Sequence, residues 1–147
     1  MNKLLLAAWA LLATAGAATA QTENDTKMKP IAMTRADFLQ KVADYEKNPD
    51  TWHYLGDKPA VIDFYASWCG PCRALAPVLD ELAAKYGEEI YVYKIDVDSE
   101  QELAAVFGIR SIPTLLFIPT EGNPRMVTGM QPKNVLEQQI REILSTR

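Results

Sequence analysis

The two cysteines of this chain, Cys69 and Cys72, are its only ones and stand two residues apart. Zinc coordination, haem attachment, a structural disulfide and thiol–disulfide exchange all use this spacing. A zinc site needs three or four nitrogen or sulfur ligands, and the chain has a single histidine, His53. Covalent haem attachment needs a histidine directly after the second cysteine, where Arg73 stands. The sequence therefore favours redox exchange, and we expect no metal and no other cofactor.

The segments around the cysteine pair predict its position. Ala60–Ala66 is an apolar strand, and after the pair apolar residues recur at helical spacing: Leu75, Leu79, Leu82 and Tyr86. The free N–H groups at a helix N-terminus favour a thiolate, which is the nucleophile in disulfide chemistry. We expect Cys69 to attack, and Cys72, one turn into the helix, to resolve the mixed disulfide. Gly70 lets the backbone bend closely, and Pro71 is tolerated in the first helical turn.

Asp63 lies in the middle of the apolar strand before the pair. A buried, unpaired carboxylate is costly, so its pKa should be raised. Such a group suits a proton acceptor for Cys72. The alternative is that Asp63 merely pairs with a lysine, and Lys94 on the next strand could be that partner. The two interpretations are compatible.

Two further residues are candidates near the thiols. Trp68 precedes Cys69 and is expected to cover the site rather than fill the core. Pro113 precedes a buried strand, where a trans proline is the default. Only about 5–6% of X–Pro bonds are cis, so the residues alone do not predict a cis bond. His53 shows no pattern and is expected to be structural or on the surface.

The remaining elements alternate along the chain. We expect a short strand at Ile31–Thr34, then a helix capped by Thr34 with Phe38, Val42 and Tyr45 on one face. A long loop, Asn48–Pro59, should be held by Trp52 and Tyr54. The later elements are a strand at Glu89–Val97, a helix at Ser99–Phe107 capped by Ser99 and Gly108, a hairpin of Thr114–Ile118 and Arg125–Gly129, and a helix at Pro132–Ser145. This order predicts an α/β domain with a central mixed sheet flanked by helices.

The N-terminal residues have the three parts of a secretory signal peptide. Met1–Lys3 is positively charged, Leu4–Leu12 is almost wholly apolar, and Ala18–Ala20 is a small-x-small cleavage site. We expect cleavage after Ala20, a flexible leader at 21–30, a domain at 31–147 and a periplasmic or otherwise exported product without stable membrane insertion. The alternative is an uncleaved membrane anchor. Export would place both cysteines where disulfides persist.

The charge of the chain limits its partners. The formal net charge is −4, and Lys and Arg form no block. This argues against binding to nucleic acid or to anionic membranes. We expect a monomer whose partners are disulfide-containing proteins and a membrane-bound or soluble thiol reductant.

Five segments together resemble the thioredoxin family: VIDFYAS, WCGPC, KIDVD, GIRSIPTLLF and the glycine at 129. The resemblance spans about Met33 to Leu144 and implies the thioredoxin fold. It implies that Cys69 and Cys72 form the redox-active disulfide, that Asp63 is the buried acid with Lys94 as its neighbour, and that Pro113 is a cis-proline. It also implies a substrate surface, made by Trp68, Gly70, Pro71, Ile112, Gly129 and Met130.

The chain departs from the family pattern in two places. Tyr65 replaces the tryptophan usual before the motif, and the segment Asn48–Lys58 is longer than in cytosolic thioredoxins. Both bear on the substrate range. The function predicted is reduction of protein disulfides outside the cytoplasm. The alternatives are a periplasmic disulfide oxidant or isomerase, and a binding module with idle thiols, which would need none of Asp63, Cys69 and Cys72.

Overall fold

The computed structural model describes residues 27–146 of the chain. The predicted signal peptide, its cleavage site and most of the leader lie outside the described residues. The elements follow in the order β1 (Ile31–Ala32), α1 (Arg35–Lys41), β2 (Ala60–Tyr65), α2 (Gly70–Tyr86), β3 (Tyr91–Asp96), α3 (Gln101–Val106), β4 (Thr114–Ile118), β5 (Arg125–Thr128) and α4 (Lys133–Ser145).

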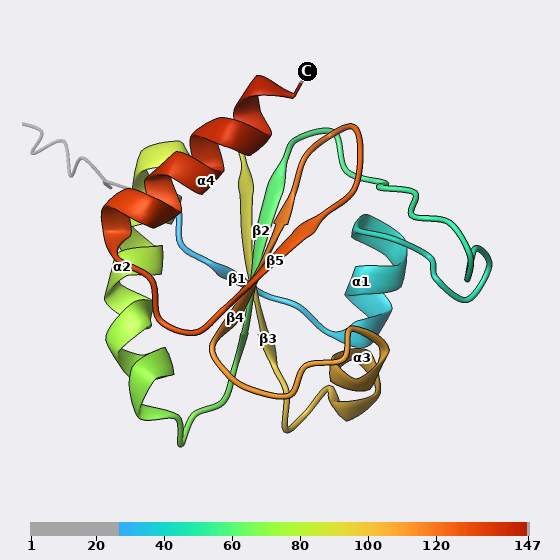
Figure 1. Cartoon of the computed structure of the whole chain (residues 1–147), viewed down its shortest axis with the longest axis horizontal. Helices are drawn as coiled ribbons and strands as arrows, with labels where there is room; N and C mark the ends of the chain where they lie inside the picture. The colour runs from blue at the N-terminus through green and yellow to red at the C-terminus, as the bar shows by residue number, and fades with distance from the viewer. Residues whose placement is uncertain (1–26, 147) are drawn as a thin grey trace, which may run out of the picture.

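The five strands form one mixed sheet in the order β1-β3-β2-β4-β5. β1 and β2 both pair with β3 in parallel, whereas β4 is antiparallel to β2 and to β5. In Figure 1 the sheet is seen edge-on, with α2 and α4 on one side and α1 and α3 on the other. This confirms the predicted mixed sheet flanked by helices.

The central strand β2 is buried on both faces, which explains its continuous apolar sequence. Val61 packs with α2 and α4, and Ile62 and Phe64 pack on the opposite side with Phe38 of α1 and Leu103 of α3. The chain leaves β2 at the lower end of the sheet in Figure 1 and turns directly into α2. The two core layers therefore fix the strand end and the helix start that carry the cysteines.

The boundaries of α1 and α3 differ from the sequence prediction. α1 ends at Lys41 with Val42 as C-cap, so Tyr45 lies beyond it, although its ring still packs against Phe38 with centroids 6.1 Å apart. α3 begins after Glu100 rather than after Ser99, and no side-chain hydrogen bond caps it. Its C-cap is not the predicted Gly108 but the residue before it, while Gly108 itself adopts φ +60°. The predicted cap of α1 by Thr34 is confirmed, with a capping box to Asp37.

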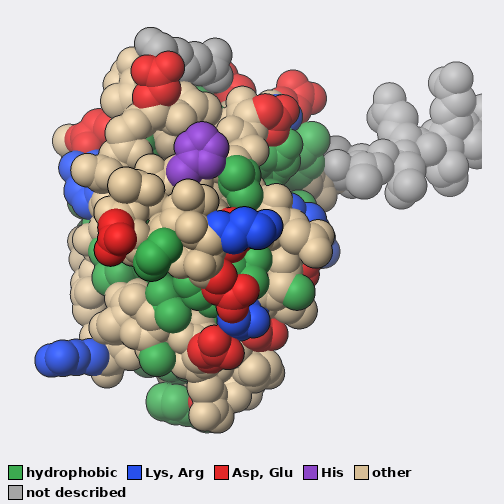
Figure 2. Space-filling model, turned by 90° about the vertical axis from the view of Figure 1, so that its right-hand side faces the viewer, with side chains coloured by type: hydrophobic (Ala, Val, Ile, Leu, Met, Phe, Trp, Pro, Cys, Tyr) green, Lys and Arg blue, Asp and Glu red, His purple; other side chains and the backbone are tan. Residues whose placement is uncertain are grey.

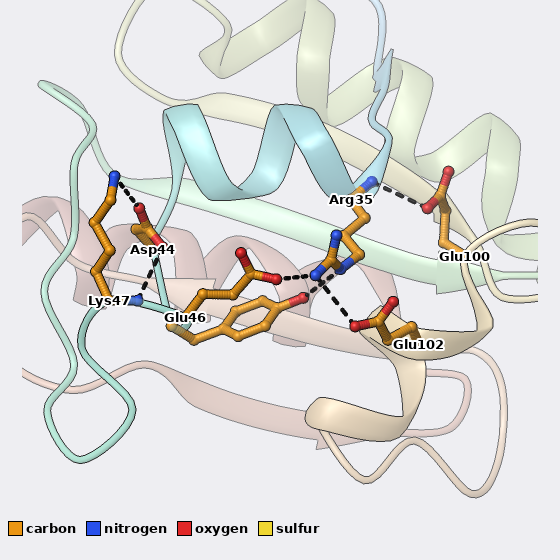
Figure 3. Close-up of polar contacts among 7 residues, drawn as sticks. Arg35, Asp44, Glu46, Lys47, Glu100 and Glu102 are labelled. Atoms are coloured by element: carbon orange, nitrogen blue, oxygen red, sulfur yellow. Dashed lines mark hydrogen bonds and ion pairs between the residues drawn. The ribbon is translucent and has the colours of Figure 1, made fainter.

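Arg35 joins α1 to α3, as Figure 3 shows. Its backbone N–H donates to the Glu100 carboxylate at 3.0 Å, and its guanidinium forms ion pairs with Glu46 and with Glu102. Its Nε–H also donates to the Tyr45 hydroxyl at 3.0 Å. These bonds hold the start of α3 in place where no side-chain cap does.

The long loop between α1 and β2 is tied to the body as expected. Trp52 packs edge-on against Phe107 with ring centroids 6.5 Å apart, and Tyr54 packs against the core cluster that contains Phe38. The Tyr54 hydroxyl also donates to the Lys58 carbonyl at 2.6 Å, a bond within the loop itself. His53 is exposed.

Figure 2 shows the side of the molecule that carries α1 and α3, where acidic and basic side chains are interspersed around apolar ones. Between residues 27 and 146, no helix is long and apolar enough to cross a membrane.

Candidate active site

The cysteine pair lies at the N-terminus of α2, as predicted. Cys69 is the N-cap residue, and the backbone N–H of Cys72 donates to its sulfur at 3.2 Å. The two sulfurs form a disulfide, with Cα atoms 5.3 Å apart. Since one N–H of the helix terminus already points at the Cys69 sulfur, the same geometry would stabilise a thiolate there once the bond is reduced.

Both cysteines are sheltered, with 4% of Cys69 and 3% of Cys72 exposed. They form a small cluster with Ala66, against which Tyr65 and Ile112 pack. The position of Cys72 one turn into the helix therefore does not make it more shielded than Cys69. In the oxidised state both residues are buried to a similar extent.

The Ile112–Pro113 peptide bond is cis, as the family resemblance implies. It lies beside the disulfide, because the Cys69 sulfur is 3.8 Å from the Ile112 carbonyl oxygen. The Pro113 carbonyl accepts a hydrogen bond from the N–H of Gly129 at 2.8 Å, and Gly129 adopts φ +87°, a conformation that favours glycine. The fold thus brings these predicted site residues together from three separate segments. Met130, the next residue, is 45% exposed.

Trp68 is 66% exposed, so it is not a core residue. Its indole N–H donates to the Asp98 carboxylate at 2.7 Å, and the Asp98 N–H in turn donates to the Asp96 carboxylate at 2.9 Å. The connection between β3 and α3 therefore fixes the direction of the ring. Sequence analysis gave Asp98 no role, although it belongs to the KIDVD segment. Nothing in its spacing indicates that its partner stands thirty residues earlier.

Asp63 is 5% exposed, and its Oδ1 has no hydrogen-bond partner. Burial raises the pKa of this carboxyl from 3.8 to about 7, against the opposing effect of the Lys94 charge. Asp63 and Lys94 are register partners on β2 and β3, so the predicted neighbours do lie side by side. The carboxyl group is thus poised to exchange a proton near neutral pH.

We compared the chain with protein-family models and with known proteins. The family model described as "Thioredoxin" matches residues 29–142. The chain is 45% identical over 112 residues to "Thioredoxin" of Borreliella burgdorferi, which covers 76% of this chain and 95% of the relative. The chain belongs to the thioredoxin family.

One further relative and one solved structure agree with this family assignment. "Thioredoxin 1" of Nostoc sp. is 39% identical over 112 residues, covering 76% of this chain and 94% of the relative. The solved structure of the "N21Q mutant thioredoxin from Halobacterium salinarum NRC-1" is 30% identical, with a TM-score of 0.64 over 80% of this chain and 92% of that one. With its disulfide at the N-terminus of α2, this thioredoxin is a thiol–disulfide oxidoreductase and acts as a protein-disulfide reductase.

Arg73 is a second residue near the site that sequence analysis did not assign. Its guanidinium donates to the Ser67 carbonyl at 3.0 Å and so spans the loop between β2 and α2 of this thioredoxin. A residue directly after the motif carries no signal for such a contact, because only the turn geometry brings it back to Ser67. Within the described part of the chain, no group of three His, Cys, Asp or Glu side chains could hold a metal ion.

Proposed function

We propose that this thioredoxin reduces the disulfides of proteins outside the cytoplasm, with Cys69 as nucleophile, Cys72 as resolving thiol and Asp63 as proton acceptor. The observation that carries the proposal is the N-cap position of Cys69, with the Cys72 N–H directed at its sulfur. Of the two sulfurs, the one at the N-cap accepts that N–H, so it is the better stabilised as a thiolate.

The reaction follows from this asymmetry. The Cys69 thiolate attacks one sulfur of the substrate disulfide, whose S–S bond breaks, and the departing substrate thiolate takes up a proton. The Cys72 thiol then loses its proton and attacks the Cys69 sulfur. This closes the disulfide present in the structure and releases the second substrate thiolate. The substrate gains two electrons, the dithiol loses two, and a thiol reductant restores the pair.

Asp63 supplies the proton acceptor for the second step. A carboxyl with a pKa of about 7 is partly ionised at neutral pH, so it can take the proton of Cys72. An ordinary exposed aspartate would be ionised but too weak a base for a thiol. Burial of Asp63 therefore makes its carboxylate a stronger base for the Cys72 proton.

The substrate is proposed to dock on the surface around the cis-proline. Ile112 is half-buried beside the Cys69 sulfur, and its backbone can pair with an extended substrate segment. Trp68 and Met130 are exposed apolar side chains that would contact the substrate, and Gly70, Pro71 and Gly129 leave its backbone room to approach. This surface suits an unfolded or extended segment that carries a disulfide.

The two thiols can be assigned by trapping. The Cys72→Ser protein, reduced and mixed with a disulfide-linked protein, should accumulate a mixed disulfide through Cys69. The Cys69→Ser protein should form none and should have no reductase activity, because only Cys69 attacks. Non-reducing electrophoresis and mass spectrometry would detect the adduct. Trapping by the Cys69→Ser protein alone would reverse the assignment.

A further inference from the structure

We propose that Tyr65 is a positioning residue that holds the Lys94 ammonium over its ring and thereby keeps that charge beside the Asp63 carboxyl. The inference rests on the proposed role of Asp63 as proton acceptor. It assigns a role to the tyrosine that stands where the family pattern has tryptophan, which the reaction sequence above leaves unused.

The register of the sheet brings the three side chains to one face. Asp63 and Tyr65 are two residues apart on β2 and so point to the same side. Lys94 is the register partner of Asp63 on the parallel strand β3 and shares that side. The Lys94 ammonium lies 5.8 Å from the centre of the Tyr65 ring, within the range of a cation–π contact.

Tyr65 also contacts the redox centre. It packs against the cluster of Ala66, Cys69 and Cys72 while remaining partly exposed. Tyr65 therefore contacts both the redox cluster and the lysine. A lysine on an exposed strand position would otherwise move its charge freely into solvent, since four rotatable bonds separate the ammonium from the backbone.

The other groups near Asp63 show which charges affect its pKa. Burial raises the pKa of Asp63, and the Lys94 charge from β3 opposes that effect. Burial also raises the pKa of the Tyr65 phenol, with smaller contributions from the charges of Asp96, its register partner, and of Asp63. From β4, the register partner of Asp63 is the apolar Leu115. The cysteines of α2 do not titrate while they are disulfide-bonded. Lys94 is thus the cation that offsets the effect of burial on the Asp63 pKa. The Tyr65 ring keeps its ammonium group close to the Asp63 carboxyl.

The experiment is an NMR titration of the Asp63 side-chain carboxyl in the oxidised, full-length protein. In Tyr65→Leu and Tyr65→Met the ammonium loses its ring and moves into solvent, so the titration midpoint of Asp63 should rise by about half a pH unit. Tyr65→Phe keeps the ring and should leave the midpoint unchanged. Leu and Met both retain an apolar side chain at this position. If one of the two variants does not fold, the other still provides the test.

Lys94→Met provides the matched control. It should raise the Asp63 midpoint by itself, and adding Tyr65→Leu should raise it no further, because the ring then has no ammonium to hold. A midpoint unchanged or lowered by Tyr65→Leu and Tyr65→Met, an equal rise in Tyr65→Phe, or an equal rise in the Lys94→Met background would each overturn the proposal.

The titration separates this inference from the proposed function. It measures Asp63 in the oxidised protein, without substrate and without turnover. A rise in the midpoint with an unchanged pH profile of disulfide reduction would support the position of Lys94 while contradicting Asp63 as proton acceptor. An unchanged midpoint would contradict the role of Tyr65 whatever the activity.

Discussion

Asp63 combines two properties that conflict in a stable protein: it is ionisable, and it is buried with one oxygen lacking a hydrogen bond. Its Lys94 neighbour offsets only part of the cost, because the pKa still rises to about 7. The folded protein therefore binds a proton that the unfolded chain, with an aspartate pKa near 3.8, releases. Stability is highest in acid with respect to this group and falls as the pH rises from about 4 to about 7.

Asp63→Asn should raise the free energy of unfolding at pH 8, where the native carboxylate is ionised. A pKa raised from 3.8 to about 7 corresponds to about 4 kcal/mol, so we expect a gain of about 2–4 kcal/mol. At pH 4 both proteins should be similarly stable. Urea denaturation at the two pH values measures the difference, and an equal effect at both would mean that ionisation is not its cause.

The same substitution should slow disulfide reduction at neutral pH by removing the proton acceptor. The wild-type rate should rise with pH around the Asp63 midpoint near 7, and the variant should lose that step. Single-turnover kinetics between pH 5 and 9, with a substrate whose own thiols titrate outside this range, would show it. Superimposable profiles would exclude Asp63 from the step.

At the scale of the elements, the N-terminus of α2 sets the redox chemistry. The cap interaction at Cys69 is one N–H bond, and the Gly70–Pro71 dipeptide between the cysteines adds no cation or imidazole. The Arg73 guanidinium donates to the Ser67 carbonyl in solvent. The reduced form of the pair is thus only moderately stabilised, which favours giving electrons to a substrate.

The potential of the pair should accordingly lie closer to about −270 mV, the value for thioredoxin, than to about −120 mV, the value for a strong oxidant. Equilibration of the protein with glutathione buffers, followed by alkylation and mass measurement, gives the number directly. A value at the oxidising end would instead favour a disulfide donor.

The connection between β3 and α3 should hold Trp68 through Asp98. In Asp98→Ala the indole N–H loses its acceptor, so its hydrogen exchange should become faster. The free energy of unfolding should change by less than about 1 kcal/mol, because both side chains are exposed. NMR of the indole N–H tests this, with Asp98→Asn, which retains an acceptor oxygen, as control. Unchanged exchange in Asp98→Ala would mean that the bond does not form in solution.

The helices and strands differ in how well the sequence predicts them. β2 and α2 were predicted from burial patterns that depend on nearby residues, and Asp63 stood out because a charge in such a strand is unusual. The bounds of α1 and α3 were less well predicted, because long-range contacts fix them. Arg35 orders the start of α3 from another helix, which no local capping signal reveals. The contact of Asp98 with Trp68 is likewise distant in sequence, whereas the contact of Arg73 with Ser67 depends on the geometry of the turn between them.

At the scale of the whole molecule, the proposal of export makes a direct prediction. The exported protein should begin near Gln21, because Ala18–Ala20 fits a signal-peptidase site. Intact-mass measurement of the protein from the extracytoplasmic fraction, compared with a variant carrying Ala20→Arg, would test it. Retention of Met1 in the membrane fraction would instead indicate a tethered enzyme.

The contact between Met28 and Gly87 shows at which end of α2 the described part of the chain begins. A Cβ atom at Gly87 would lie 2.5 Å from the Met28 sulfur, so the first described residues lie against the C-terminal end of α2. Cys69 caps the opposite end of this 17-residue helix, a length of about 25 Å. A chain held by its N-terminal end, on a bilayer or on a bead, would therefore be attached at the end of α2 opposite the disulfide. Immobilisation through that end should leave substrate access intact.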